Sequence, residues 1–364
     1  MTAVNSNRFY YPALDGLRGV AILLVIIYHN FNFINQSQFG WLGVDLFFVL
    51  SGFLITTILL NDAGSPHFLK NFFIRRILRI FPLYFLCLII FLILFPFLGL
   101  YKKELSFFIA NQWWLWTYLQ NWLYSLFLTD DAKMLTHLWS LAVEEQFYLI
   151  WPFIILLVKK PGKLFFIMLT VLFLVFFGRS LLWFSHITDL NYTTLYTFTR
   201  IDGICIGSMV ALLMRFRPGL IGKYMAIIVL TLACINFVFY FLNQSKKNDY
   251  PYLSFVGYTT FCAMFGLLVH EIVSGNNKIL NNILSISPLR FLGKISYGFY
   301  VFHWPVYVIT WQYFSAFCHD TLHLTDATSK LGASLLSTGL GFIISIISYY
   351  SFELFFLRLK HKFK

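Results

Sequence analysis

LDGLRGVAILLVIIYHN, residues 14–30, is an apolar run that contains one arginine and one histidine. Arg18 and His29 are eleven residues apart, which is three helical turns, so the two side chains share a helix face and lie roughly 16 Å apart along the axis. Taken alone, the pair has a structural explanation: an arginine that snorkels to lipid head groups and a histidine satisfied by its packing neighbours. A functional interpretation therefore depends on the rest of the chain.

Composition indicates the environment of this run. The 364 residues are 59% hydrophobic and 12% charged, far from the shares of a soluble domain. Apolar runs of about 20 residues, long enough to cross ~30 Å of hydrocarbon as helices, recur to the end of the chain. We therefore expect an all-α polytopic membrane protein, one transmembrane domain over residues 1–364 with no soluble domain. The ten expected spans lie near 14–34, 41–60, 77–99, 137–157, 164–184, 194–214, 221–242, 252–273, 294–315 and 332–357.

The segment 104–128 is a partial eleventh candidate. It is rich in Trp, but polar residues interrupt it, so we expect an interfacial or re-entrant piece. With ten spans and both termini cytoplasmic, most Lys and Arg residues fall on the cytoplasmic side, as the positive-inside rule predicts. A full span at 104–128 would invert everything after it and place the basic tail outside. The interrupting residues are Asn111, Gln112, Gln120 and Asn121.

The net charge of +12 reflects this topology and an attraction to anionic lipid head groups. It does not indicate a nucleic-acid surface. The cysteines are scattered through or beside apolar runs without CxxC pairing, so we expect neither disulfides nor a metal site. They are Cys87, Cys205, Cys234, Cys262 and Cys318.

Acidic side chains also lie inside the expected spans, where a charge exposed to lipid costs ~2.5 kcal/mol or more near the centre. Asp45 is about one turn inside the outer end of the second span, and Glu144 and Glu145 are about two turns inside that of the fourth. Two adjacent carboxylates cannot share one helix face, so at least one faces protein or a water-filled cavity. A carboxylate near His29 can orient its ring or raise its basicity.

Arginine and histidine complete the intramembrane polar set. RRILR, residues 75–79, lies at the cytoplasmic end of the third span and resembles a phosphate clamp, although anchoring by the positive-inside rule also explains it. Arg200 and Asp202 open the sixth span at its outer face, and His303 lies near mid-depth in the ninth. A structural Arg–Asp pair and a histidine bonded to a helix carbonyl remain open alternatives.

Six motifs carry a resemblance to a known family. In chain order they are DGLRGxAxxxVxxxH, GVDLFFVLSGFLIT, RRxxRxxP, WSLAVEEQFYLIWP, RIDGIxxG and LGxISYGxYxxHxP. The set resembles the acyltransferase-3 family of integral-membrane acyltransferases over nearly the whole chain. The resemblance implies transfer of an acyl group, usually acetyl, from cytoplasmic acetyl-CoA to a hydroxyl of a surface glycan, in the bacterial cytoplasmic (inner) membrane.

Many members of that family also carry a C-terminal extracytoplasmic SGNH hydrolase-like domain. This sequence ends at Lys364 without one. We therefore expect a stand-alone form, which either acylates its acceptor directly or works with a separate extracytoplasmic transferase. The sequence does not decide its oligomeric state.

The resemblance assigns roles to particular residues. The family often shows one more arginine where this chain has Leu78, which places more weight on Arg76 and Arg79 as ligands of the donor. The residues expected to bind the phosphates of CoA are Arg18, Arg75, Arg76, Arg79 and Lys294. The expected catalytic residues are His29, Asp45, Glu144 and Tyr148, and the expected acceptor-binding or structural polar layer is Arg200, Asp202 and His303.

The expected chemistry follows from these roles. His29 deprotonates an acceptor hydroxyl as it attacks the thioester, and Asp45 or Glu144 orients the imidazole. Tyr148 or Arg200 stabilises the oxyanion. In a variant of this scheme, His29 itself carries the acetyl group.

Two points stay open from sequence alone. A transporter or flippase of a glycan or anionic substrate also uses intramembrane ionisable groups, although no internal repeat supports it. The acceptor can be lipopolysaccharide O-antigen, capsule, peptidoglycan or an exported small molecule. Tryptophans at the outer rim can stack on sugars but are more typical of interfacial anchors; they are Trp41, Trp113, Trp114, Trp116 and Trp122.

Overall fold

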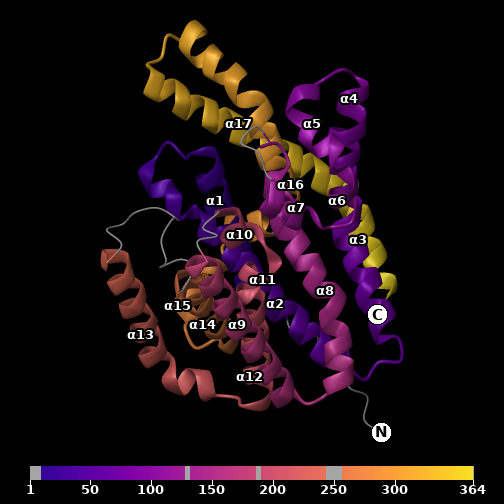
Figure 1. Cartoon of the computed structure of the whole chain (residues 1–364), viewed down its shortest axis with the longest axis vertical. Helices are drawn as coiled ribbons and strands as arrows, with labels where there is room; N and C mark the ends of the chain where they lie inside the picture. The colour runs from indigo at the N-terminus through magenta and orange to yellow at the C-terminus, as the bar shows by residue number, and fades with distance from the viewer. Residues whose placement is uncertain (1–9, 128–131, 186–189, 243–255, 364) are drawn as a thin grey trace.

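The computed structural model of the chain describes residues 10–127, 132–185, 190–242 and 256–363. Those residues form helices and connecting turns, and no strand occurs among them (Figure 1). The longer helices are α1 (Pro12–Asn30), α2 (Leu42–Asp62), α3 (Phe68–Leu88), α8 (Trp139–Val158), α9 (Pro161–Phe184), α12 (Asp202–Phe216), α13 (Leu220–Leu242), α14 (Tyr258–Ser274), α16 (Ser287–Ala316) and α17 (Asp326–Ser348). The shorter ones are α4 (Phe95–Phe97), α5 (Lys102–Ala110), α6 (Gln112–Trp116), α7 (Gln120–Phe127), α10 (Leu190–Leu195), α11 (Thr197–Arg200), α15 (Lys278–Leu284) and α18 (Leu354–Leu359). Short 3-10 or π segments are η1 (Asn35–Trp41), η2 (Ile89–Leu94), η3 (Thr136–Leu138), η5 (Phe317–Thr321), η6 (Tyr349–Glu353) and η7 (Lys360–Lys362).

The all-α, multi-pass expectation is confirmed. Three of the ten expected spans, near 194–214, 252–273 and 294–315, fall on α12, α14 and α16. These helices have 15, 17 and 30 residues. The count of ten and the orientation of the termini stay predictions. Within the described part of the chain, seven helical segments are long and apolar enough to cross a membrane: 12–30, 35–62, 68–97, 136–158, 161–182, 220–238 and 326–359.

The segment 104–128 is not one continuous helix. It forms α5, α6 and α7, none longer than nine residues, which fits the expectation of an interfacial or re-entrant piece. Its polar residues bond to neighbouring structure: Gln120 Nε2 donates to the Leu138 carbonyl at 2.9 Å, and Asn121 Nδ2 donates to Thr197 Oγ1 at 2.8 Å. The amides that interrupt the apolar pattern therefore fix α7 against η3 and α11.

Glycines bring two helix pairs into backbone contact. A Cβ atom added to Gly19 of α1 would lie 2.2 Å from the Leu289 carbonyl oxygen of α16, and one added to Gly293 of α16 would lie 1.8 Å from the Asp15 carbonyl oxygen of α1. Between α2 and α12, a Cβ at Gly52 would lie 2.0 Å from the Ile204 carbonyl oxygen. Small residues allow such close approach in membrane helices. They set α1 against α16 and α2 against α12, helices that carry several of the expected site residues.

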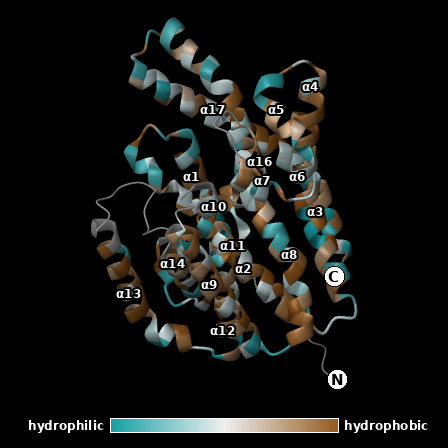
Figure 2. Ribbon diagram, viewed as in Figure 1, coloured by the Kyte–Doolittle hydropathy of each residue, from teal (hydrophilic) through white to brown (hydrophobic). Residues whose placement is uncertain are grey.

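The periphery of the bundle is apolar. Figure 1 shows α13 at its edge, and Figure 2 shows that helix coloured as hydrophobic along most of its length. Only 6% of the residues in the most apolar stretch of α13 are buried inside the bundle. A helix so exposed and so apolar suits contact with lipid rather than with water.

Candidate active site

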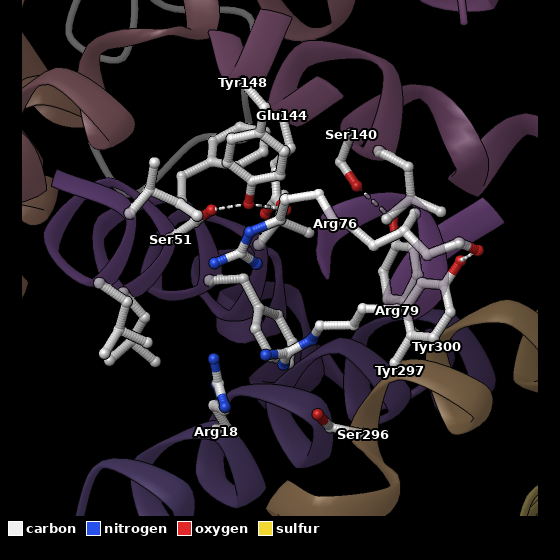
Figure 3. A pocket seen from close by; sticks show the side chains of 18 residues that line it. Arg18, Ser51, Arg76, Arg79, Ser140, Glu144, Tyr148, Ser296, Tyr297 and Tyr300 are labelled. Carbon is white, nitrogen blue, oxygen red and sulfur yellow. Dashed lines mark hydrogen bonds between the residues drawn. The ribbon is translucent and has the colours of Figure 1, made fainter. Parts of the chain in front are cut away.

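Three arginines point into one cavity, here called the basic cavity. Arg18 comes from α1, and Arg76 and Arg79 come from α3 (Figure 3). Arg18 Nη1 lies 3.5 Å from Asp15 Oδ1, whereas neither Arg76 nor Arg79 forms an ion pair with any described residue. Three guanidinium groups that converge on one cavity, two of them without an ion-pair partner, suit a bound phosphate-rich anion.

The opposite wall of the basic cavity is a hydrogen-bonded group on α2 and α8. Tyr148 Oη donates to Glu144 Oε2 at 2.8 Å and also forms a short hydrogen bond with Ser51 Oγ (Figure 3). The Arg76 guanidinium carbon lies 5.2 Å from the centre of the Tyr148 ring, within the range of a cation–π contact. The wall thus holds one of the three arginines in place.

A second cavity, here called the aromatic cavity, lies beside the first. Val44 and Tyr300 line both cavities, so the two meet at these side chains. The Tyr300 hydroxyl is held by Ser140 Oγ at 2.7 Å and by the His137 carbonyl. Other side chains that line the aromatic cavity are Tyr28, His29, Trp41, Trp139, Arg200 and Tyr258.

His29 is held by a second histidine. Its Nδ1 lies 3.0 Å from His303 Nε2, and His303 Nδ1 lies 2.7 Å from the Tyr300 carbonyl oxygen. The carbonyl only accepts, so His303 Nδ1 carries the proton and its Nε2, in the neutral ring, accepts from His29 Nδ1–H. This network leaves Nε2 of a neutral His29 with a free lone pair. His29 is thereby prepared to act as a base.

Two buried ion pairs lie beside Tyr258 of the aromatic cavity, and of their four charged side chains only Arg200 lines that cavity. Arg200 Nη2 lies 2.5 Å from Asp45 Oδ1, and Arg179 Nη2 lies 3.1 Å from Asp202 Oδ2. The Arg200 guanidinium carbon lies 3.8 Å from the centre of the Tyr258 ring, and that of Arg179 lies 5.6 Å from the same centre. All four charged side chains are at most 3% exposed, so each charge needs the partner that it has.

The sequence model of the acyltransferase-3 family, described as an acyltransferase domain, matches residues 11–350. The chain belongs to this family of acyltransferases. Membership favours acyl transfer over transport for the two cavities just described.

Named relatives match most of this chain. "Peptidoglycan O-acetyltransferase OatA" of Listeria monocytogenes is 32% identical over 324 residues, which cover 84% of this chain and 50% of the relative. "Putative peptidoglycan O-acetyltransferase YrhL" of Bacillus subtilis is 32% identical, with 83% and 49% covered. "Putative O-acetyltransferase SACOL0978" of Staphylococcus aureus is 30% identical, with 84% and 52% covered. The chain spans about half the length of these relatives. No solved structure matches it.

The structure corrects the expected partner of His29. Asp45 is bound by Arg200, and Glu144 is bound by Tyr148 in the basic cavity, so neither carboxylate orients the imidazole. A buried carboxylate is stabilised far more by a guanidinium than by a neutral ring, which explains the pairing of Asp45. The orienting residue is His303, which the sequence placed only in the polar layer.

Two residues of the expected CoA-binding set lie outside the basic cavity. Arg75 Nη1 contacts Asp62 Oδ2 at 3.1 Å, and its Nε donates to the Phe363 carbonyl. Lys294 Nζ lies 5.2 Å from the centre of the Tyr349 ring. Both side chains have local structural partners, so three of the five residues expected to bind CoA line the basic cavity.

Sequence reasoning missed several site residues and mispaired one. Asp202 pairs with Arg179 of α9 instead of Arg200. Arg179 has a signal in the sequence, because it stands alone among apolar residues in LFLVFFGRSLLWF. Tyr300 stands inside a quoted motif and His137 two residues before another, both without an assigned role; His137 Nε2 lies 3.1 Å from the Val301 carbonyl oxygen. Of the rim tryptophans, Trp41 lines the aromatic cavity.

Proposed function

We propose that this chain is a membrane-bound O-acetyltransferase that moves acetyl from cytoplasmic acetyl-CoA to a hydroxyl of an extracytoplasmic glycan. The observation that carries the proposal is the contact of the two cavities at Val44 and Tyr300. The basic cavity carries three arginines, two of them without an ion-pair partner among the described residues, and the aromatic cavity carries a histidine oriented by a hydrogen bond. A two-substrate transfer requires such a pair of sites. The names of the relatives support O-acetyl transfer to peptidoglycan as the glycan class.

The donor occupies the basic cavity in this proposal. Arg18, Arg76 and Arg79 bind the diphosphate and 3′-phosphate of CoA, and the pantetheine arm runs past Val44 and Tyr300 toward His29. The helical rise between Arg18 and His29 is roughly 16 Å, comparable to the reach of that arm. One helix therefore positions both ends of the donor.

The chemistry is a direct acyl transfer. His29 Nε2 removes the proton of the acceptor hydroxyl while its oxygen forms a bond to the thioester carbonyl carbon. The tetrahedral intermediate breaks its carbon–sulfur bond, and the leaving thiolate of CoA takes the proton back from His29. The products are an acetyl ester of the glycan and CoA thiol. No acetyl group stays on the protein, in contrast to the variant in which His29 acts as a relay.

The aromatic cavity holds the acceptor. Aromatic faces and a few polar groups are the usual lining of a site for a ring-shaped neutral ligand. In the proposed topology this cavity lies toward the outer face of a bacterial cytoplasmic membrane, where peptidoglycan precursors and other glycans are present. A separate extracytoplasmic transferase is not required by this scheme.

The proposal is tested by transfer in a defined system. The purified chain in lipid nanodiscs is mixed with acetyl-labelled acetyl-CoA and soluble peptidoglycan fragments, and ester formation is measured by mass spectrometry. We expect ester on the glycan and one CoA thiol released per ester. Release of CoA without ester in the presence of several glycans, or no binding of acetyl-CoA, would contradict the proposal.

A further inference from the structure

Arg200 has hydrogen-bonding capacity that the chain does not use. It is 3% exposed, its Nη2 is taken by Asp45, and its Nε and Nη1 have no hydrogen-bond partner among the described residues. A buried N–H group without a partner costs about 1–3 kcal/mol, so such groups are normally paired. Arg200 lines the aromatic cavity. Nε and Nη1 are themselves buried, so a ligand seated against Arg200 in that cavity is the partner from outside the chain that these N–H groups lack.

The charge around Arg200 favours an uncharged ligand. The guanidinium of Arg200 is balanced by Asp45, and that of Arg179 is balanced by Asp202, at 2.5 and 3.1 Å. A carboxylate or phosphate added here would leave one negative charge uncompensated in a buried site, which is strongly unfavourable. A carbonyl oxygen accepts a hydrogen bond and adds no charge.

The surroundings of Arg200 suit a sugar ring. Tyr258 stacks under the guanidinium at 3.8 Å, and Trp139 lies 5.6 Å from the guanidinium carbon. Trp41 meets the Tyr258 ring edge-on at 5.3 Å between ring centres. These rings fix the plane of Arg200 and provide apolar faces for the carbon–hydrogen surface of a sugar.

We propose that Arg200 binds an uncharged carbonyl oxygen of the acceptor, such as that of the acetamido group of an N-acetylated sugar. The contact holds the sugar so that a hydroxyl faces His29, which lines the same cavity. Arg200 is then a specificity-determining residue of the acceptor site. This inference rests on the proposed function, because it presupposes a glycan acceptor.

The first test changes the acceptor and leaves the protein intact. Two β-1,4-linked oligosaccharides of equal length, one of N-acetylglucosamine and one of glucose, are compared with a third that carries uronic carboxylates. We expect kcat/KM to be at least about tenfold higher for the N-acetylated oligomer, the value of one hydrogen bond to a charged group. Equal rates for the first two, or preference for the carboxylate, would overturn the inference and leave the proposed function standing. No transfer to any oligomer would overturn both.

The second test changes Arg200. Arg200→Lys keeps a cation beside Asp45 but removes the extra guanidinium N–H groups. We expect a higher KM for the N-acetylated oligomer, loss of its advantage over the glucose oligomer, and an unchanged KM for acetyl-CoA. Arg179→Lys, in the pair that does not line the cavity, is the matched control and should retain the advantage. An equal fall in kcat for both oligomers in Arg200→Lys, without a change in preference, would show that Arg200 does not read the acceptor.

Discussion

His29 Nδ1 and His303 Nε2 lie 3.0 Å apart, and His303 Nδ1 lies 2.7 Å from the Tyr300 carbonyl oxygen, which fixes the ring of His303. The two histidines come from α1 and α16, which glycines bring into backbone contact. The tautomer of His29, and with it the availability of its Nε2, thus depends on a residue 274 positions away. His303 is a positioning residue in the proposed reaction.

Replacing His303 tests this role. We expect His303→Ala to lower kcat about 10- to 100-fold, within the usual contribution of a correctly oriented acid–base group, with KM for acetyl-CoA unchanged. His303→Gln should recover part of the rate, because its side-chain carbonyl can accept from His29 Nδ1–H. Steady-state kinetics of both variants decide the matter. Full activity of His303→Ala, or equal loss in both variants, would argue against orientation through this hydrogen bond.

The basic cavity predicts which cations bind CoA. Arg79→Ala should weaken acetyl-CoA binding about 10- to 100-fold, because hydrogen bonds between charged groups contribute about 1.5–3 kcal/mol. Lys294→Ala should change the affinity less than about twofold, since Lys294 lies over Tyr349 outside the cavity. Isothermal titration calorimetry in nanodiscs measures both. A large effect of Lys294→Ala would mean that CoA also contacts Lys294, as the sequence suggested.

The contact between the cavities predicts a narrow passage. Val44 is 8% exposed and lines both cavities. Val44→Phe should obstruct the path of the thioester and lower kcat at least tenfold, which corresponds to a rise of about 1.4 kcal/mol or more in the activation free energy. The affinity for CoA without an acetyl group should stay near the wild-type value. Leu54→Phe, in the basic cavity alone, serves as a comparison. Undiminished transfer by a folded Val44→Phe protein would place the path elsewhere.

The glycine contacts predict a stability effect. Gly293→Ala forces a methyl group toward the Asp15 carbonyl, at 1.8 Å in the present backbone, and should destabilise the protein by about 1–3 kcal/mol or prevent folding. Gly339→Ala meets no atom within 4 Å and should be neutral or up to about 1 kcal/mol stabilising. Thermal unfolding in detergent compares the two. Equal melting temperatures would mean that α1 and α16 are not held at this distance.

Some features were predictable from sequence because local pattern determines them. The length of the apolar runs predicted most of the long apolar helices. The spacing of Arg18 and His29, three helical turns, predicted that their side chains share one face of the first helix. The polar interruptions of 104–128 indicated a broken segment, which the structure forms as α5, α6 and α7. Each of these follows from the chemistry of neighbouring residues.

Pairing between helices was not predictable, because it depends on which faces pack together. Arg200 and Asp202 are two residues apart and looked like a pair, yet they bind Asp45 and Arg179 from α2 and α9. Likewise, the sequence indicated Asp45 or Glu144 as the partner of His29, whereas the structure places His303 of α16 there. Asp45 and Asp202 are buried, but their partners depend on how the helices pack and could not be predicted from local pattern.

The central claim is that His29 is the base of an acetyl transfer, and His29→Ala tests it most directly. The rate of ester formation on peptidoglycan fragments is measured at saturating labelled acetyl-CoA, together with the affinity for acetyl-CoA. We expect the rate to fall at least about 100-fold and the affinity for acetyl-CoA to stay unchanged, because the basic cavity is intact. Acetylation by His29→Ala at the wild-type rate would contradict it.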